Sequence, residues 1–263
     1  DNVQGATDVG PNPDSLPGYY GLAAGSWKHF ASVWGVDYDW IKGRYAPDMM
    51  EKSGTTVSRW VDAVLEKNDM IDQQTNVKGL FFWGHAPNSQ TRGLDMKRAM
   101  NKLDLLVVVD PYPSATAAMA AMPPAEGDTV NKNRNVYLLP AATQFETVGS
   151  ATASNRSLQW REKVIDPLFE SVPDHVIMQA FADRLGFGEE LSKNYKILNS
   201  KFAGKQWREP QIEDILREIN RSVWTIGYTG QTPERLKAHM RMVGTFDPRT
   251  LKSRGGVDPV TGY

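Results

Sequence analysis

The 263-residue sequence contains no cysteine. This absence excludes disulfides, zinc ribbons, iron–sulfur ligation and thiolate catalysis by the chain itself. Its four histidines, His29, His85, His175 and His239, do not have the spacing of metal ligands. We therefore predict neither a metal site nor a cluster site built from this chain alone.

The sequence also lacks a charge excess and long hydrophobic runs. Its 30 Lys and Arg against 31 Asp and Glu give a net charge of -1, which argues against nucleic acid as a partner. No apolar stretch approaches the ~20 residues of a membrane span, so direct membrane insertion is not expected. The start lacks an initiator Met and a signal peptide, and no regular element closes the end. We therefore expect an interior piece of a longer polypeptide.

The middle of the chain predicts the fold class. Apolar runs at 77–83, 105–109 and 136–140 are typical of buried strands, and helical patterns at 90–103 and 115–122 separate them. Such a β-α-β-α-β order indicates an α/β fold, with a Rossmann-like, mostly parallel sheet flanked by helices. The crossovers should be right-handed.

The flanking regions predict further elements. Residues 1–22 are rich in Gly and Pro and predict a structured loop. Helices are expected at 26–40, 56–67, 173–185 and 212–223, and from Thr232, which precedes Pro233 as an N-cap. The last third of the chain is therefore expected to be mostly helical.

Three loops follow predicted strands, at the sheet edge where open α/β folds bind ligands. The first, 84–90, leads toward a helix and could hold a phosphate; the alternative is an ordinary turn capped by Asn88 or Ser89. The second has Asp110, whose carboxylate could accept hydrogen bonds from ribose or guanine. The alternative there is an Asp-Pro turn with helix capping.

The third loop, 146–160, is the most unusual. A dozen small and polar residues follow the strand at 136–140 and lead into Arg156, Gln159 and Trp160. A loop of this length in a compact domain is usually functional or disordered. The polar side chains and the flanking Trp160 favour an ordered loop around a polar ligand.

Several short motifs together resemble one family. They are Asn2-Val3-Gln4-Gly5 with Asp8, Pro17-Gly18-Tyr19, Gly84-x-x-Pro87, Asp110-x-x-x-Ser114-x-Thr116, Glu146-x-x-Gly149-x-x-Thr152 and Arg156-x-x-Gln159. In this order they resemble the alpha subunit of formate dehydrogenases, in the molybdopterin oxidoreductase superfamily with dimethyl sulfoxide reductase and nitrate reductase. The resemblance covers 1–187 well and implies that these residues are part of an α/β dinucleotide-binding region. Residues 188–263 carry no assignable motif, and we assign them to a helical C-terminal extension or linker.

The resemblance implies a cofactor, a bis-molybdopterin guanine dinucleotide with molybdenum or tungsten. The implied contacts are Gly84, His85, Pro87 and Asn88 for phosphates; Asp110, Ser114 and Thr116 for guanosine; Gly149, Asn155, Arg156 and Gln159 for the pterin or diphosphate; and Gly5, Asp8, Glu146 and Thr152 elsewhere on the cofactor. One departure is Ala86, which stands where the family carries a polar residue, so that Asn88 would have to substitute for it.

The resemblance also implies that the catalytic centre lies outside this chain. The longer enzyme would oxidise formate to CO2 and pass electrons to a 4Fe–4S cluster that this chain does not ligate. Implied partners are the rest of the alpha subunit, an iron–sulfur beta subunit and a cytochrome subunit. The implied location is the periplasm, with the cytoplasm as the alternative.

Two other readings stay open. The first is a non-catalytic α/β scaffold subunit of a respiratory complex. The small and polar residues at 149–159 argue against it, because a scaffold would not need a loop of this composition. The second is another molybdopterin oxidoreductase, such as a nitrate reductase. Only the opening motif and the overall similarity favour a formate dehydrogenase over it. A generic nucleotide-binding enzyme is disfavoured, because neither G-x-G-x-x-G nor G-x-x-x-x-G-K-[ST] follows a strand.

Overall fold

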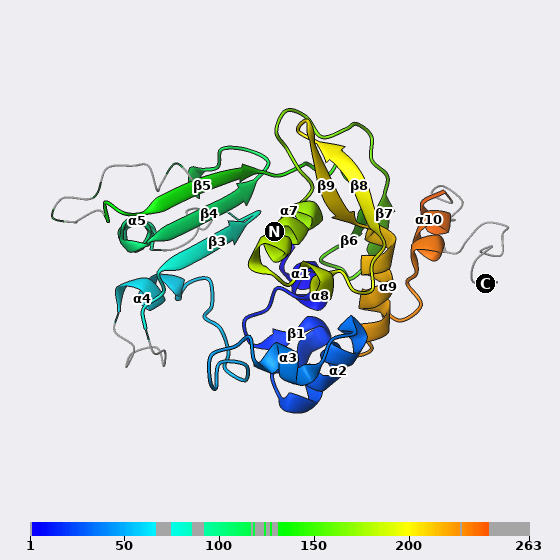
Figure 1. Ribbon diagram of the computed structural model, residues 1–263, viewed down its shortest axis with the longest axis horizontal. Helices are drawn as coiled ribbons and strands as arrows, with labels where there is room; N and C mark the ends of the chain where they lie inside the picture. Colours follow the sequence, from blue (N-terminus) through cyan, green and yellow to red (C-terminus); the bar gives the residue numbers. More distant parts are fainter. Residues whose placement is uncertain are drawn as a thin grey trace. The chain divides into compact units, whose positions relative to one another are not determined.

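The computed structural model describes residues 2–66, 75–85, 92–116, 118, 124, 127, 131–226 and 228–241. The chain divides into two compact units (Figure 1). Unit 1 comprises Asp1–Ser53, Gln144–Asp166 and His175–Tyr263, and unit 2 comprises Gly54–Thr143 and Pro167–Asp174.

Unit 2 contains the predicted parallel sheet. Strands β3 (Gly79–Trp83), β4 (Leu105–Asp110) and β5 (Asn135–Pro140) lie in the order β3-β4-β5, with both pairs parallel (Figure 1). Helix α5 (Gly93–Lys102) connects β3 to β4. The α/β prediction is confirmed for this unit. The helix predicted at 115–122 lies largely outside the described residues.

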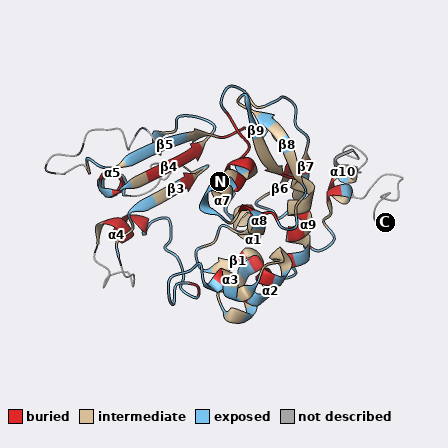
Figure 2. Ribbon diagram, viewed as in Figure 1, coloured by how far each residue is buried: buried red, intermediate tan, exposed pale blue. Residues whose placement is uncertain are grey.

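The core of unit 2 forms between this sheet and two helices. Met96 and Met100 of α5 pack with Leu106 and Val108 of β4 and with α4 (Trp60–Leu65). Strand β4 is therefore buried, whereas residues 135–138 of β5 are exposed (Figure 2). Helix α4 is shorter than the predicted 56–67.

In unit 1, the start of the chain contains a helix where a loop was predicted, so that prediction is wrong. Helix α1 spans Val3–Val9, and the Asn2 side chain caps it by accepting a hydrogen bond from Gly5 N–H at 3.2 Å. The Pro- and Gly-rich stretch begins only after this helix. It forms β1 (Ser15–Leu16), the 3-10 turn η1 (Pro17–Tyr19) and β2 (Tyr20–Gly21).

The single helix predicted at 26–40 is two helices. Helix α2 (Ala24–Trp34) ends at Gly35, which has a left-handed φ of 70°, and α3 (Tyr38–Lys42) follows after Asp37 caps it. Glycine adopts this conformation without strain, so the sequence can turn sharply there. The aromatic side chains of both helices pack into one cluster around Trp27 and Phe30.

The segment 146–160, predicted to be one ordered loop, contains a β-hairpin, so the prediction of a loop over its whole length is wrong. Strands β6 (Gly149–Thr152) and β7 (Leu158–Arg161) pair antiparallel. The side chain of Asn155 holds the turn by accepting hydrogen bonds from the N–H and hydroxyl of Ser157, at 3.0 and 2.7 Å.

The rest of the chain contains the predicted helices and one hairpin that was not predicted. Helices α7 (Asp174–Leu185), α9 (Ile212–Ser222) and α10 (Pro233–Arg241) match the sequence pattern, and Thr232 caps α10. A short helix α8 (Gly188–Leu191) precedes an antiparallel pair, β8 (Ile197–Phe202) and β9 (Lys205–Pro210). The extension is thus helical with an inserted hairpin. The boundary predicted near residue 187 stays a prediction.

Candidate functional site

The carboxyl ends of the parallel strands bring two of the predicted loops together in unit 2. Gly84 follows β3 with a left-handed φ of 58°, and its N–H donates to Val109 O at 2.8 Å. On the other side of β4, Ala141 N–H donates to Asp110 O at 3.1 Å. The three strands therefore end at one edge, as the sheet topology requires.

Behind this edge lie buried polar atoms that lack partners. Thr116 is fully buried, and its hydroxyl donates to His85 O at 3.4 Å, which joins the first loop to the second. His85 Nε2 and Ser114 Oγ are buried and have no hydrogen-bond partner among the described residues. Buried polar groups without partners are rare and unfavourable. His85 and Ser114 belong to the loops that follow β3 and β4, respectively.

Asp110 forms a turn, as the alternative interpretation of its sequence predicted. Its carboxylate accepts a hydrogen bond from Tyr112 N–H at 3.0 Å. A carboxylate can accept several hydrogen bonds, so this contact leaves capacity for a ligand. Pro87 and Asn88 lie outside the described residues.

In unit 1, helix α1 packs against the end of β6. The Asn2 side-chain amide donates to Thr152 O at 2.5 Å. Gly5 lies so close that an added Cβ would stand 2.1 Å from the same oxygen. The motif Asn2-Val3-Gln4-Gly5 therefore serves a close contact between helix and strand.

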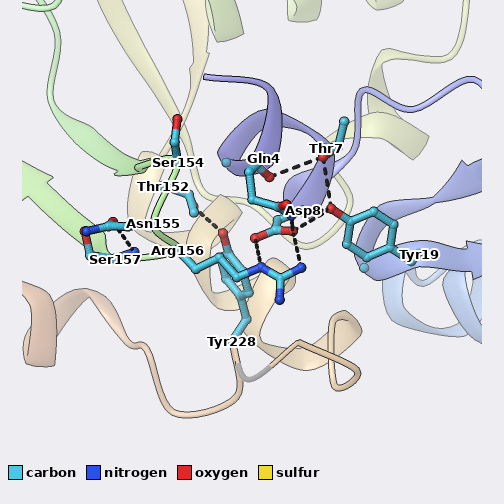
Figure 3. Close-up of polar contacts among 12 residues, drawn as sticks. Gln4, Thr7, Asp8, Tyr19, Thr152, Ser154, Asn155, Arg156, Ser157 and Tyr228 are labelled. Carbon is cyan, nitrogen blue, oxygen red and sulfur yellow. Dashed lines mark hydrogen bonds and ion pairs between the residues drawn. The ribbon is translucent and has the colours of Figure 1, made fainter. Parts of the chain in front are cut away.

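A polar cluster surrounds Asp8, which is fully buried at the end of α1 (Figure 3). Its Oδ1 accepts hydrogen bonds from the Tyr19 hydroxyl at 2.7 Å and from Gln4 Nε2 at 2.8 Å. Arg156 Nε lies 3.2 Å from Oδ2 as an ion pair, but Oδ2 accepts no hydrogen bond from the described residues. We call these four residues the Asp8 cluster.

Arg156 is positioned at the turn between β6 and β7. It has a left-handed φ of 65°, which is uncommon for a residue with a side chain. A hydrogen bond with Tyr19 and the charge of Asp8 raise the pKa of its guanidinium above the ordinary value. Since the side chain is 52% exposed, this permanently charged group can also contact an anion from solvent.

A small cavity adjoins the cluster. It has a volume of about 200 Å³ and is lined by Arg156, Ser157, Leu158, Ile226, Tyr228 and Gln231. The hydroxyl of Tyr228 is hydrogen-bonded to that of Thr152 (Figure 3). Burial raises the pKa of Tyr228, so the phenol stays protonated near neutral pH.

The remaining predicted residues of unit 1 lie on or near the same hairpin but outside the Asp8 cluster. Gly149 and Glu146 are buried, and Asn155 and Gln159 are exposed. Gln159 stands opposite Ala151 in the register of the hairpin. The structure therefore joins Asp8 to Arg156 and Gly5 to Thr152, but it does not bring Gln159 or Glu146 to the cluster.

Sequence reasoning missed some members of this site. Gln4 and Tyr19 belong to two of the quoted motifs, but no role was predicted for either residue. Their place in these motifs was the only sequence signal that could have identified them. Tyr228 follows no motif, and its partner Thr152 lies 76 residues away. Nothing in the sequence could have connected those two residues.

Two absences among the described residues bear on the class of site. Within those residues, no group of three or more His, Cys, Asp or Glu could hold a metal ion. No helix in the described part of the chain is long and apolar enough to cross a membrane.

Comparison with known proteins then gives the class. No family model matches the chain. The chain is 29% identical over 237 residues to the F420-dependent formate dehydrogenase subunit alpha of Methanocaldococcus jannaschii. These 237 residues are 90% of this chain and 27% of that protein. It is also 29% identical over 239 residues to a putative formate dehydrogenase of Staphylococcus haemolyticus, covering 90% of this chain and 19% of that protein. A probable oxidoreductase of Bacillus subtilis is 30% identical over 190 residues, which are 71% of this chain and 16% of that protein.

The class that these relatives define is that of formate dehydrogenases, which are oxidoreductases. The resemblance found in the motifs is confirmed. More narrowly, the Methanocaldococcus jannaschii relative is an alpha subunit, and the chain is similar to part of that subunit. The chain spans about a quarter or less of the length of the relatives compared here.

Proposed function

We propose that this chain is the part of a molybdenum or tungsten formate dehydrogenase that binds and orients a molybdopterin guanine dinucleotide. The observation that carries the proposal is the pair of buried atoms without partners, His85 Nε2 and Ser114 Oγ, at the carboxyl edge of a parallel sheet. Such atoms fit a ligand rich in hydrogen-bonding groups, and the relatives are formate dehydrogenases.

The residues of unit 2 suit the nucleotide end of this cofactor. The backbone at Gly84, together with His85, would bind phosphate oxygens. Ser114 would hydrogen-bond the guanosine, and Asp110 would accept from its ribose or from the base edge. Thr116 would position the first loop through its hydrogen bond to His85 O.

The residues of unit 1 suit an anionic part of the cofactor. Arg156 is half exposed, always charged and held by Asp8, so it can bind a diphosphate oxygen in a charge-assisted hydrogen bond. Gly5 and Thr152 fix the helix that carries Asp8. Gly149, Asn155, Gln159 and Glu146 would shape the hairpin around the ligand.

When bound, the metal-pterin group supplies the redox chemistry that takes formate to CO2. The residues of this chain bind and orient that group and do not touch formate. We further propose that electrons leave through a 4Fe–4S cluster held elsewhere, and that the partners are the rest of the alpha subunit, an iron–sulfur beta subunit and a cytochrome subunit. We place the longer protein in the periplasm, with the cytoplasm as the alternative; fractionation of the native host distinguishes these locations.

The decisive experiment compares Ser114→Ala with Ser58→Ala in the longer protein. Ser58 is an exposed serine in the same unit. We expect Ser114→Ala to lower the guanine nucleotide released per chain, measured at limiting cofactor, by about fivefold or more, since removing one partner of a buried hydrogen bond is worth about 1–3 kcal/mol. Ser58→Ala should release the wild-type amount.

A stability measurement separates this binding role from a folding role. Because Ser114 Oγ is buried and has no partner among the described residues, its removal should not lower the unfolding free energy of the cofactor-free protein and could raise it. Unchanged nucleotide and metal content in Ser114→Ala would remove the proposal's central residue. A wild-type protein without pterin or metal would favour the non-catalytic scaffold.

A further inference from the structure

Unit 1 contains a second cavity, which shares no residue with the Asp8 cluster. It has a volume of about 640 Å³, within the range of small-molecule sites. Its walls come from α2, α3, residues 185–195 and α9. Six aromatic side chains line it: Trp27, Trp34, Trp40, Tyr45, Phe187 and Tyr195.

Contacts with neighbouring residues hold the aromatic wall in place. Trp27 Nε1 donates to Met50 O at 2.9 Å, and the Trp27 ring meets the Tyr45 ring edge-on with centroids 5.5 Å apart. The guanidinium of Arg44 lies 4.6 Å from the centroid of Trp40. One ring of the wall therefore already binds a cation through its face.

Two carboxylates complete the lining, Glu190 and Glu218. Glu218 is only 9% exposed and accepts hydrogen bonds from the Tyr195 hydroxyl and from Asn194 Nδ2, the latter at 3.2 Å. Neither glutamate forms an ion pair with a described residue. Burial raises the pKa of Glu218, which a cation placed beside it would offset.

We propose that this cavity binds an organic cation of the quaternary or aryl ammonium class, through cation–π contacts with the aromatic wall and charge pairing with Glu190 and Glu218. Aromatic side chains combined with carboxylates match both the apolar body and the charge of such a ligand. Arg44 is the one basic residue of the lining. Because it is exposed and stacked on Trp40, it stands at the rim.

The test uses calorimetric titration of the intact longer protein with three aromatic probes that differ in charge: benzyltrimethylammonium, benzyl alcohol and phenylacetate. We expect the cation to bind about tenfold or more tightly than the other two, as cation–π and charge contacts of this kind predict. Added salt should weaken it. Tighter binding of phenylacetate would indicate that Arg44 dominates the site and would overturn the proposal. The proposal would also be overturned if none of the three probes bound.

Variants locate the binding within the cavity. Tyr45→Phe keeps the ring and should keep the affinity, whereas Tyr45→Leu should weaken the cation several-fold. Glu190→Gln and Glu218→Gln should each weaken the cation and leave benzyl alcohol unaffected. Glu189→Gln is the control for net charge, because this neighbour lies outside the cavity and pairs with Arg208 instead. Equal weakening by Glu189→Gln would reduce the effect to general surface charge and contradict the proposal.

Discussion

The contact of Gly5 with β6 predicts the effect of the smallest possible enlargement, Gly5→Ala. The new Cβ would lie 2.1 Å from Thr152 O and 2.5 Å from Asn2 Oδ1. Non-bonded heavy atoms rest roughly 3.5 Å apart, so α1 would have to move by more than about 1 Å. Thr152 O cannot yield easily, because it is backbone in a paired strand.

Two effects add to give the magnitude. Overpacking of this kind costs about 1–3 kcal/mol. Movement of α1 also breaks the hydrogen bond from Asn2 to Thr152 O, which is worth about 1 kcal/mol. The expected loss is therefore about 2–4 kcal/mol, which lowers the Tm of a protein this size by roughly 5–15 °C.

Thermal unfolding followed by circular dichroism measures this loss. Gly25→Ala is the matched control in the same unit: it lies in α2, and nothing would stand within 4 Å of its Cβ. That change should be neutral or stabilise by about 0.5–1 kcal/mol, because alanine is the better helix former. If Gly5→Ala and Gly25→Ala had the same Tm, the argument from the close contact of α1 with Thr152 would be refuted.

Two carboxyl groups predict opposite dependences of stability on pH. Burial raises the pKa of Glu218, so its ionisation disfavours the folded state increasingly as pH rises above the unfolded pKa of ~4.3. Urea denaturation should therefore find Glu218→Gln more stable than wild type at about pH 8 and equal to it at about pH 3; a constant difference would contradict this. For Glu209, burial acts to raise the pKa, but hydrogen bonds from His175 and Ser200 lower it overall. Its stabilising effect is present above the unfolded pKa and lost as pH falls through the folded pKa. Ser200→Ala should thus cost about 1–2 kcal/mol at neutral pH and less at about pH 3, and denaturation curves showing a greater cost in acid would exclude this role.

The strands of unit 2 could be predicted because their signals are local. Each is a run of apolar residues bounded by turn residues, and β4 ends at Asp110-Pro111. Helix α1 could not be predicted from the sequence, because Gly5 within it disfavours a helix in isolation. A cap by Asn2 and contact with Thr152, 150 residues away, stabilise it instead.

The hairpins escaped prediction for a related reason. The sequence Gly149-Ser-Ala-Thr152 contains only small residues and no large apolar side chain, so its strand signal is weak. The pairing with β7 and the burial of Trp160 supply the missing stability. The same limit applies to the site, because motifs identify Asp8 and Arg156 separately and only the hairpin joins them.

The exposure of β5 has a consequence for handling the protein. Val136, Tyr137 and Leu138 are 40–52% exposed on a strand that pairs with β4 on one side of the three-stranded sheet. An apolar strand at a sheet edge is a template for pairing with a second polypeptide. Purified alone and concentrated, this chain should self-associate through β5, and a charged side chain at Tyr137 would be the simplest way to keep it monomeric.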